Sequence, residues 1–350
     1  MTAMEQKMYD SAGSNFSRSE RMCALLALLA FAVMAMSQMD GQTDGNRASG
    51  SEPQSLQSLP DGRETIAAGY VGAPFYHRSD LSLRRPDGTD LTLKRLGWDG
   101  DALYFPIDGG ARVVRWNRSL GWMVDFMHNK AIARLGKGAH GRKIKNGVVD
   151  HVETHGTLKG KPAPSPLRLT DLFNRLEFTH GHNTLMVTGL VRLMSTSRIR
   201  PYIGIGVGAA IPHVEVRFAG ERRWTNQYQY AGPSFQLLAG LEFRRGRGSY
   251  FIEYKFICAS IHAALTGEHS WSLKKLKLTW LPRWLIEPFA GLTELPGDLW
   301  NQFARWRKGE RPADGTIKTQ LWAHTVVVGG GYVWPGGRLP AQTGRPLHDR

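Results

Sequence analysis

Cysteine is nearly absent from this 350-residue chain, which contains 2 of them. Cys23 falls in an amino-terminal apolar segment that we expect to be removed, so Cys258 remains alone and no intramolecular disulfide is possible. Beyond that segment, no apolar run is long enough for a transmembrane helix. GxSxG, Walker, HExxH and CxxC patterns are also missing, so the commonest hydrolase, nucleotide-binding and zinc templates do not apply.

The amino terminus has the composition of an export signal. Arg18 and Arg21 precede an apolar run from Met22 to Met36, and small residues near Ser37 suit a signal peptidase. We therefore expect a signal peptide over residues 1–37, with a short membrane anchor as the alternative. Residues 38–63 have almost no large apolar groups and are predicted to be a disordered lead-in. The folded barrel is expected over residues 64–334, and residues 335–350 are predicted to be a disordered tail.

The formal net charge of +15 favours an anionic partner. Export argues against nucleic acid and leaves an anionic membrane surface. Phosphates of lipopolysaccharide are the natural anion at the outer surface of a Gram-negative bacterium. We expect a monomer in the outer membrane, with lipid A or lipopolysaccharide as its partner.

Period-2 segments rich in β-branched residues, aromatics and glycine predict eight strands. Tight turns follow the second, fourth and sixth strands, whereas most of the other connections are long. The predicted strands are Glu64–Tyr76, Leu103–Trp116, Leu120–Ala133, His180–Met194, Arg198–Phe218, Asn226–Phe243, Ser249–Ala264 and Ile317–Trp334.

Short turns at one rim, long loops at the other and an even strand count are typical of an outer-membrane barrel. The last strand supports this, because its glycines suit a closing seam and Tyr332 and Trp334 suit a membrane boundary. Alternation along Ile203 to Val207 and along Phe235 to Phe243 predicts a lipid-facing stripe with a narrow polar interior. We therefore predict an all-β fold, an eight-stranded antiparallel transmembrane β-barrel. A soluble eight-stranded barrel such as a lipocalin is the alternative.

On this topology, 11 of the 12 histidines fall in the outer half or the outer loops. Histidine is the commonest metal ligand, so the bias predicts a site facing the cell exterior. The alternative is that a polar rim tolerates histidine whereas the lipid-facing belt excludes it. His180 and His182 share one face of an extended strand and are the predicted metal ligands. Candidate catalytic residues on neighbouring strands are Asp125, His128, His213, Glu215 and Glu253. A charge network that only stabilises the interior is the competing interpretation for Asp125 and Glu253.

The outer loops carry three further signals. His151 and His155 share a face in a basic loop, which we interpret as solvated rather than metal-binding. Asp298 is predicted to cap a helix that carries aromatics on one side and ends at Gly309, lying on the membrane surface or forming a lid. The basic residues predicted to hold lipid phosphates are Arg222, Arg223 and Lys274.

Four segments resemble the lipid A oxidase family, outer-membrane barrels similar in build to outer-membrane protein W. They are Glu177–Asn183, Arg200–Val216, Gln229–Gln236 with Gly240–Arg244, and Asp298–Trp300. The resemblance implies oxidation of the proximal glucosamine of lipid A to 2-aminogluconate with molecular oxygen, releasing hydrogen peroxide. No flavin or Rossmann pattern is present to accept electrons, so a divalent metal ion of unknown identity is the expected cofactor, with oxygen as co-substrate. A non-enzymatic barrel, either a narrow channel or a structural protein, is the alternative, and a lipid A deacylase is a third possibility.

Overall fold

The computed structural model describes residues 63–194, 198–269 and 283–335. The expected signal peptide, lead-in and tail, and also Lys274, lie outside these ranges. Eight antiparallel strands form a closed barrel in which the first strand pairs with the last. Around the barrel they are β1 (Arg63–Tyr76), β5 (Gly109–Asn117), β6 (Leu120–His128), β13 (Thr184–Arg192), β14 (Ile199–Ala210), β17 (Gly232–Arg245), β18 (Gly248–Leu265) and β19 (Gly315–Pro335). The predicted eight-stranded antiparallel barrel is confirmed.

The seam between β1 and β19 depends on glycine. A Cβ atom at Gly329 would lie 2.4 Å from the carbonyl oxygen of Gly69, and one at Gly331 would lie 2.2 Å from that of Ala67. These contacts are too short for any side chain, so glycine lets the two strands close the barrel. Within the same seam, Tyr332 pairs with Ala67 and Trp334 with Thr65, and both aromatic side chains are exposed on the outer wall.

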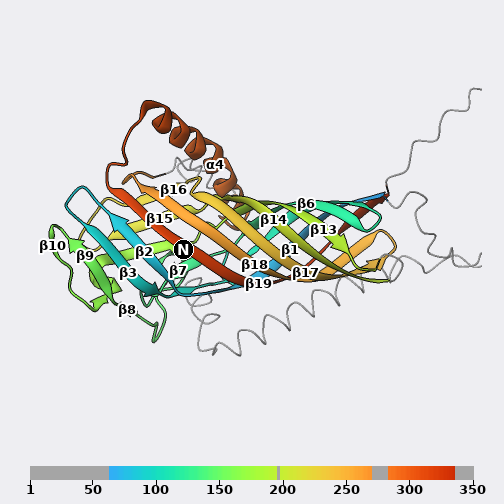
Figure 1. Cartoon of the computed structure of the whole chain (residues 1–350), viewed down its shortest axis with the longest axis horizontal. Coiled ribbons are helices and arrows are strands. Elements are labelled where there is room, and N and C mark those ends of the chain that lie inside the picture. The colour runs from blue at the N-terminus through green and yellow to red at the C-terminus, as the bar shows by residue number, and fades with distance from the viewer. Residues whose placement is uncertain (1–62, 195–197, 270–282, 336–350) are drawn as a thin grey trace, which may run out of the picture.

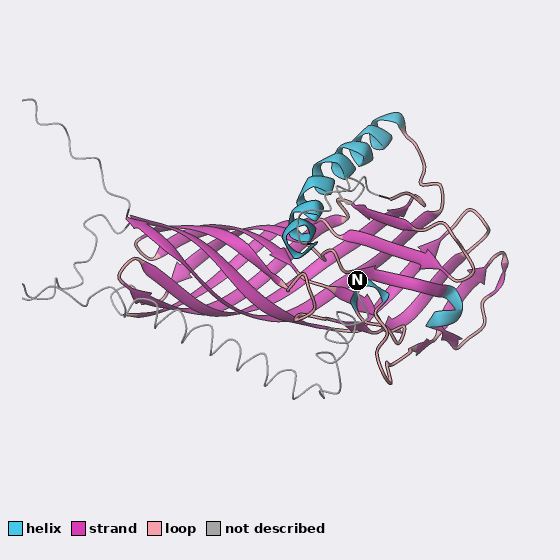
Figure 2. Cartoon of the chain, turned by 180° about the vertical axis from the view of Figure 1, so that it is seen from behind, coloured by secondary structure: helices cyan, strands magenta, loops and turns pink. Residues whose placement is uncertain are grey.

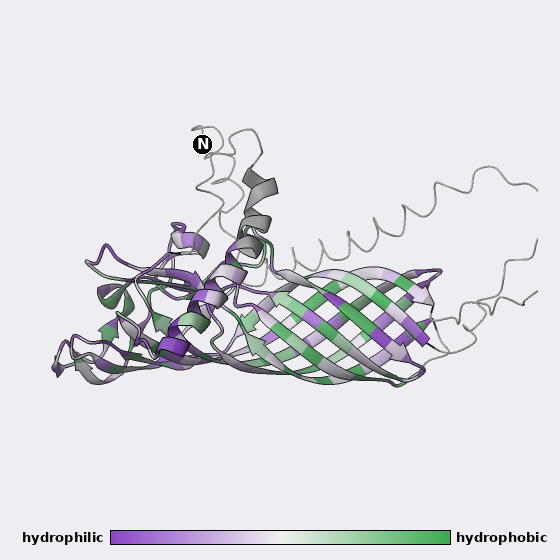
Figure 3. Cartoon of the chain, turned by 90° about the horizontal axis from the view of Figure 1, so that it is seen from above, coloured by the Kyte–Doolittle hydropathy of each residue, from purple (hydrophilic) through white to green (hydrophobic). Residues whose placement is uncertain are grey.

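The outer wall of the barrel is apolar and its interior is charged. Figure 3 shows apolar residues distributed along the barrel strands, and Ile203, Ile205 and Val207 are 47%, 58% and 65% exposed. Their neighbours Tyr202 and Gln236 point inward and are buried, as the alternation predicts. A continuous apolar surface of this kind on a closed barrel fits a lipid bilayer. Among the described residues, no helix is long and apolar enough to cross a membrane.

Ion pairs fill the barrel interior. Lys255 and Asp125, both with 0% of the side chain exposed, form a salt bridge, and Tyr70 donates a hydrogen bond to Asp125 over 2.7 Å. Arg112 pairs with Glu253 at 2.8 Å. In a low-dielectric interior each charge is tolerated because its partner is present. This arrangement is the stabilising network expected as the alternative role for Asp125 and Glu253.

Away from the short turns, the wall continues past the closed barrel (Figure 1). β19 exchanges its partner β1 for β2 (Ser79–Arg84), and the sheet continues through β3 (Asp90–Leu96) and β9 (Thr154–Leu158) to β10 (Lys161–Pro162). A second sheet has the order β16 (Thr225–Tyr228), β15 (His213–Phe218), β12 (Phe173–Phe178), β7 (Ala131–Ala133) and β4 (Trp98–Asp99). In the described residues, β8 (His151–Val152) and β11 (Leu167–Arg168) form a separate antiparallel pair. Much of the sequence expected to form long loops is therefore sheet.

The two sheets of this extension enclose a hydrophobic core. Side chains such as Leu321 and Ile261 on the barrel wall pack in the same buried cluster as Phe178 and Val214 of the second sheet. Three predicted strands that were expected to be continuous break where they leave the barrel, between β6 and β7, β14 and β15, and β16 and β17. Pro212, which has no amide hydrogen to donate, occupies one of these breaks.

The part of the chain that the structure describes contains three helical segments, which are η1 (Ala139–Gly141), α3 (Leu169–Leu172) and α4 (Arg283–Lys308). The predicted cap at Asp298 is wrong, because α4 starts earlier and Asp298 lies within it. Its carboxylate instead accepts a hydrogen bond from the backbone amide of Tyr228 over 2.8 Å. The predicted end is confirmed, since α4 stops before Gly309, which has a φ of 66°. Figure 2 shows α4 standing away from the side of the barrel, with Trp300 and Trp306 exposed.

Replacing Lys255 by methionine removes one partner of a fully buried ion pair. We expect Lys255→Met to lower the free energy of unfolding by about 3–5 kcal/mol, because the Asp125 carboxylate then stays buried without its cation. Urea unfolding in detergent micelles, followed by tryptophan fluorescence, measures the loss. The double variant Lys255→Met/Asp125→Leu removes both charges and should recover most of the stability. A single variant as stable as the wild type would contradict this account of the interior.

Candidate functional site

The second sheet brings the site residues together. β12 and β15 are antiparallel neighbours, and Glu177 lies directly opposite Glu215 in their register. Along β15, Val214 and Val216 belong to the hydrophobic core. Side chains alternate along a strand, so His213 and Glu215 project to the opposite face. The site is therefore on the face of the second sheet that points away from the core.

Three side chains form a set of potential metal ligands. Ligand atoms of His140, His180 and Glu215 all lie within 4.8 Å of one another, which makes them the one such group of three in the described ranges 63–194, 198–269 and 283–335. Nδ1 of His180 is 2.7 Å from Oε1 of Glu215. The imidazole of His180 also lies between two others, with ring centroids 4.5 Å from His140 and 4.7 Å from His213.

The carboxylate of Glu215 is held at a fixed position beneath the histidines. It is fully buried and accepts a hydrogen bond from the hydroxyl of Thr179 over 2.7 Å. The guanidinium of Arg175 spans both glutamates, with 3.0 Å from Nη1 to Glu215 and 2.7 Å from Nε to Glu177. These partners fix the orientation of Glu215, while His180 keeps 27% of its side chain exposed.

The electrostatics favour an ionised carboxylate at Glu215 and neutral imidazoles at His140 and His213. Burial lowers the pKa of His140 to about 3, and it also lowers the pKa of His213. Burial alone would raise the pKa of Glu215, but His180 and His213 beside it hold that pKa well below its usual range. Burial and then the charge of Glu215 raise the pKa of Glu177 well above its usual range. Neutral imidazole and ionised carboxylate are the forms that bind metal ions.

Tyr228 connects this cluster to helix α4. Its hydroxyl donates a hydrogen bond to the backbone carbonyl of His180 over 3.1 Å, and its ring centroid lies 4.5 Å from that of His213. The backbone amide of Tyr228 donates to Asp298, and the carboxamide of Gln302 pairs with both backbone groups of Tyr230. Hydrogen bonds therefore attach helix α4 to the end of β16, next to the histidine cluster.

The structure brings some predicted site residues together and separates others. His180, His213 and Glu215 are neighbours in the cluster. His128 lies near it and contacts Asn183, with 3.0 Å between Nδ1 and Oδ1. Asp125 and Glu253 lie in the barrel interior within the ion-pair network, apart from the cluster.

The expected pairing of His180 with His182 rested on an extended strand, and that premise is wrong. β13 begins at Thr184, and Gly181 has a φ of 122°, which turns the chain between the two histidines. His182 is buried and its Nδ1 lies 3.2 Å from the hydroxyl of Tyr76. It is not part of the three-ligand group, in which His140 takes the place expected for it.

Sequence reasoning missed His140, Arg175 and Glu177 as site residues. His140 sits in a short loop helix with a φ of 57° and has no periodic pattern around it. Arg175 and Glu177 alternate on β12, but only its pairing with β15 places them beside Glu215. The sequence signal for these two residues is a basic residue two positions before an acidic one, close to His180. Such a pattern is too common to identify a site.

The remaining predictions concern loop residues. Arg222 and Arg223 are exposed between β15 and β16, and Arg223 donates to the carbonyl of Thr266 over 3.2 Å. Their role in holding phosphates stays a prediction. His155 is exposed and lies 2.9 Å from Glu153, outside the three-ligand group, as is His151.

The site fits a divalent transition metal ion. Two imidazoles with one carboxylate are a known ligand set for non-haem iron, and imidazole also suits zinc, copper and nickel. Nε2 of His213 is buried beside the cluster and makes no hydrogen bond with any residue that the structure describes. This nitrogen is therefore a further potential metal ligand or proton acceptor. The fit rests on His140, His180 and Glu215, with His213 adjacent.

Comparison with known proteins yields distant structural likenesses. No protein-family model matches the chain, and no curated protein matches it. Among solved structures, outer membrane protein AlkL in lipid bilayers is 12% identical, covering 85% of this chain and 100% of its own, with a TM-score of 0.33. Neisserial surface protein A is 7% identical, covering 76% of this chain and 96% of its own, with a TM-score of 0.26. At these values the two proteins do not bear on the function of this chain.

Proposed function

We propose that this protein is an outer-membrane enzyme that oxidises the proximal glucosamine of lipid A to 2-aminogluconate. Molecular oxygen is the acceptor, and a divalent metal ion is the cofactor. The observation that carries the proposal is the ligand group of His140, His180 and Glu215, whose ligand atoms lie within 4.8 Å of one another. Two histidines and one carboxylate with open positions are typical of non-haem iron sites that use oxygen.

The family resemblance supports the same site. Glu177–Asn183 and Arg200–Val216, which carry the resemblance most strongly, contribute His180 and Glu215 to the cluster. Asp298 begins another resembling segment and supports Tyr228 through its backbone amide. Segments distant in the sequence thus meet at one place in the fold, as expected if they serve a shared chemistry.

The reaction balances without another reductant. A hemiacetal at the anomeric carbon loses its C–H hydrogen and its O–H hydrogen with two electrons, which gives a lactone and reduces oxygen to hydrogen peroxide. Water then opens the lactone to the 2-aminogluconate unit. A bound redox metal ion would supply a route for the two electrons from sugar to oxygen.

The residues of the chain would position the substrate and handle protons. Glu215 is fixed by Arg175 and Thr179, so it can orient His180 through the 2.7 Å contact. His180 uses one ring nitrogen for the metal ion and the other for Glu215, so the candidate general base for the sugar hydroxyl is His213, whose Nε2 makes no hydrogen bond with the described residues. Arg222 and Arg223, in the adjoining turn, are the proposed phosphate contacts.

A barrel filled with side chains supports an enzyme over a channel. Lys255, Asp125 and Glu253 are each 0–1% exposed in the lumen. An open aqueous pore would leave such groups hydrated. The apolar outer wall places the barrel in a membrane, and the basic composition favours the anionic outer leaflet.

Lipid A with a free anomeric hydroxyl on the proximal glucosamine, from a Gram-negative host that lacks this modification, tests the activity. Cells that produce the wild-type protein aerobically should contain lipid A heavier by one oxygen atom, detected by mass spectrometry, and extracts should release hydrogen peroxide. His180→Ala should abolish the product, because it removes a metal ligand, whereas exposed His155→Ala should leave it unchanged. An unaltered lipid A profile with correctly assembled protein would favour a passive barrel. Loss of an acyl chain would indicate a hydrolase.

Metal content tests the ligand assignment separately. We expect the purified wild-type protein to retain a divalent metal ion measured by elemental analysis, and Glu215→Gln to lower metal affinity by at least about tenfold. His182→Ala should retain the metal, because His182 lies outside the ligand group. Equal metal content in wild type and Glu215→Gln would contradict the assignment, and so would loss of metal in His182→Ala alone.

A further inference from the structure

A groove of about 690 Å³ lies on the outer wall where β19 changes partners. Ala323 and later residues of β19 pair with β1, whereas Thr316–Thr319 pair with β2. Between these two regions the chain turns at His77 and Arg78, and a recess opens over Gln320 and Trp322. The groove is a consequence of the exchange of strand partners.

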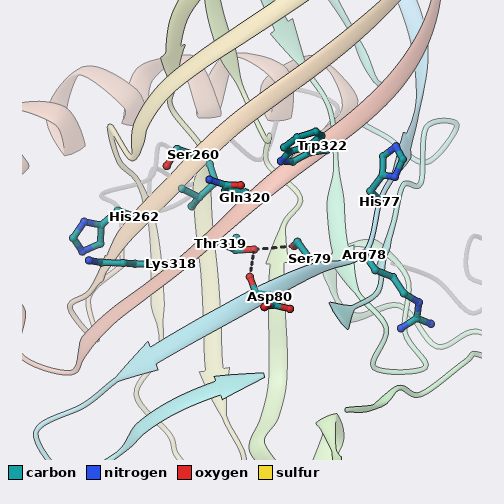
Figure 4. Close-up of a pocket in the computed structure, with 11 residues that line it drawn as sticks. His77, Arg78, Ser79, Asp80, Ser260, His262, Lys318, Thr319, Gln320 and Trp322 are labelled. Atoms are coloured by element: carbon teal, nitrogen blue, oxygen red, sulfur yellow. Dashed lines mark hydrogen bonds between the residues drawn. The ribbon is translucent and has the colours of Figure 1, made fainter. Parts of the chain in front are cut away.

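The groove is basic at both ends. Figure 4 shows Lys318 and His262 at one end, and His77 and Arg78 at the other. Lys318 and His262 are exposed, opposite each other in the β18–β19 register, and neither has an ion-pair partner among the described residues.

The acidic group in the groove is already neutralised. Asp80 forms a salt bridge with Lys94 and accepts a hydrogen bond from the backbone amide of Arg95. At the other end, Arg78 binds Asp150 at 2.8 Å but keeps 42% of its side chain exposed. The groove therefore presents an excess of cationic and hydrogen-bond-donating groups to an incoming anion.

Aromatic residues lie on β18 and β19 next to the groove, on the side toward the closed barrel. Trp322 is 43% exposed, and its ring centroid lies 5.8 Å from that of Phe256. Further along are Tyr254 and Ile252, both exposed on the apolar wall. Aromatic side chains of this kind mark the boundary between lipid chains and water, so the basic groups sit at headgroup level.

The groove and the histidine cluster are on opposite sides of the extension. Along β19, Thr319 and Leu321 point inward, and Leu321 joins the core between the sheets, while Lys318 and Gln320 point outward. The cluster around Glu215 lies on the far face of the second sheet. A ligand in the groove is thus separated from the cluster by both sheets.

We propose that this groove binds the phosphate headgroup of a membrane lipid whose acyl chains lie along the aromatic and aliphatic wall below. Lys318 and His262 donate to the phosphate at one end, and Trp322 packs on the upper part of the chains. The occupant is a lipid rather than a free anion, because the cation Lys318 and the hydrogen-bond donor His262 are continuous with the apolar belt. Binding here is independent of the proposed oxidation, since the residues and the face of the fold differ.

Native mass spectrometry of the full chain released from detergent micelles tests the proposal. The probes are phosphatidic acid, diacylglycerol with the same chains, and inorganic phosphate. We expect phosphatidic acid to bind the wild type most tightly. Affinity should fall by at least about tenfold in Lys318→Ala/His262→Ala, as expected for lost charge-assisted hydrogen bonds. Exposed Lys161→Ala on β10, far from the groove in sequence and sheet order, is the matched control and should bind as the wild type does.

Each other outcome contradicts the proposal in its own way. Unchanged affinity in the double variant would place the lipid elsewhere on the barrel. Equal binding of diacylglycerol would show that phosphate is not recognised, and equal binding of inorganic phosphate would show that the groove is not a lipid site. Phosphatidic acid carries no sugar, so the result stands whether or not lipid A oxidation is observed.

Discussion

The paired strands β18 and β19 are the element on which the rest of the structure depends. Their ladder runs the full length of β18, 18 residues from Gly248 to Leu265. At one end this ladder completes the barrel, because β19 also closes onto β1. At the other end the same ladder continues past β1 and provides an edge for β2. One continuous set of backbone hydrogen bonds thus joins the apolar barrel to the extension that carries the site.

The extension exists because the ladder can bury apolar surface on its inner face. Leu321 and Ile261 on the two long strands pack in one core with Phe178 and Val214 of the second sheet. Once that core forms, alternation leaves the other face of the second sheet for polar groups. Glu215 and His213 occupy that face, and Arg175 forms a salt bridge with Glu215 there. The position of the potential metal ligands therefore follows from which face of the second sheet packs into the hydrophobic core.

The sequence predicts the barrel well because strands such as β13 and β18 alternate regularly between exposed and buried residues, and because the tight turns at Asn117–Leu120 and Arg245–Gly248 are local features. The extension is harder to predict. Its strands are short, and some of its pairings join segments far apart in the chain, such as β2 with β19. His213 and Glu215 were found because they alternate on a strand. His140 was not, because its position depends on the path of a loop whose backbone has a positive φ.

The incorrect pairing of His180 with His182 has a simple physical cause. Two residues separated by one position share a face only when the chain between them is extended. Gly181, with a φ of 122°, adopts a conformation that other residues rarely reach. When a glycine separates two histidines, the chain between them need not be extended, so strand periodicity cannot be assumed. The turn at Gly181 also allows His180 to face Glu215.

X-ray absorption at the metal edge of the purified, metal-loaded protein tests the central claim most directly, because it reports the ligands without relying on turnover. The account predicts a divalent ion bound by nitrogen and oxygen donors, with imidazole scattering that diminishes in His140→Ala and stays unchanged in His155→Ala. A bound metal ion with no imidazole contribution would contradict it, as would a spectrum that His140→Ala leaves unaltered.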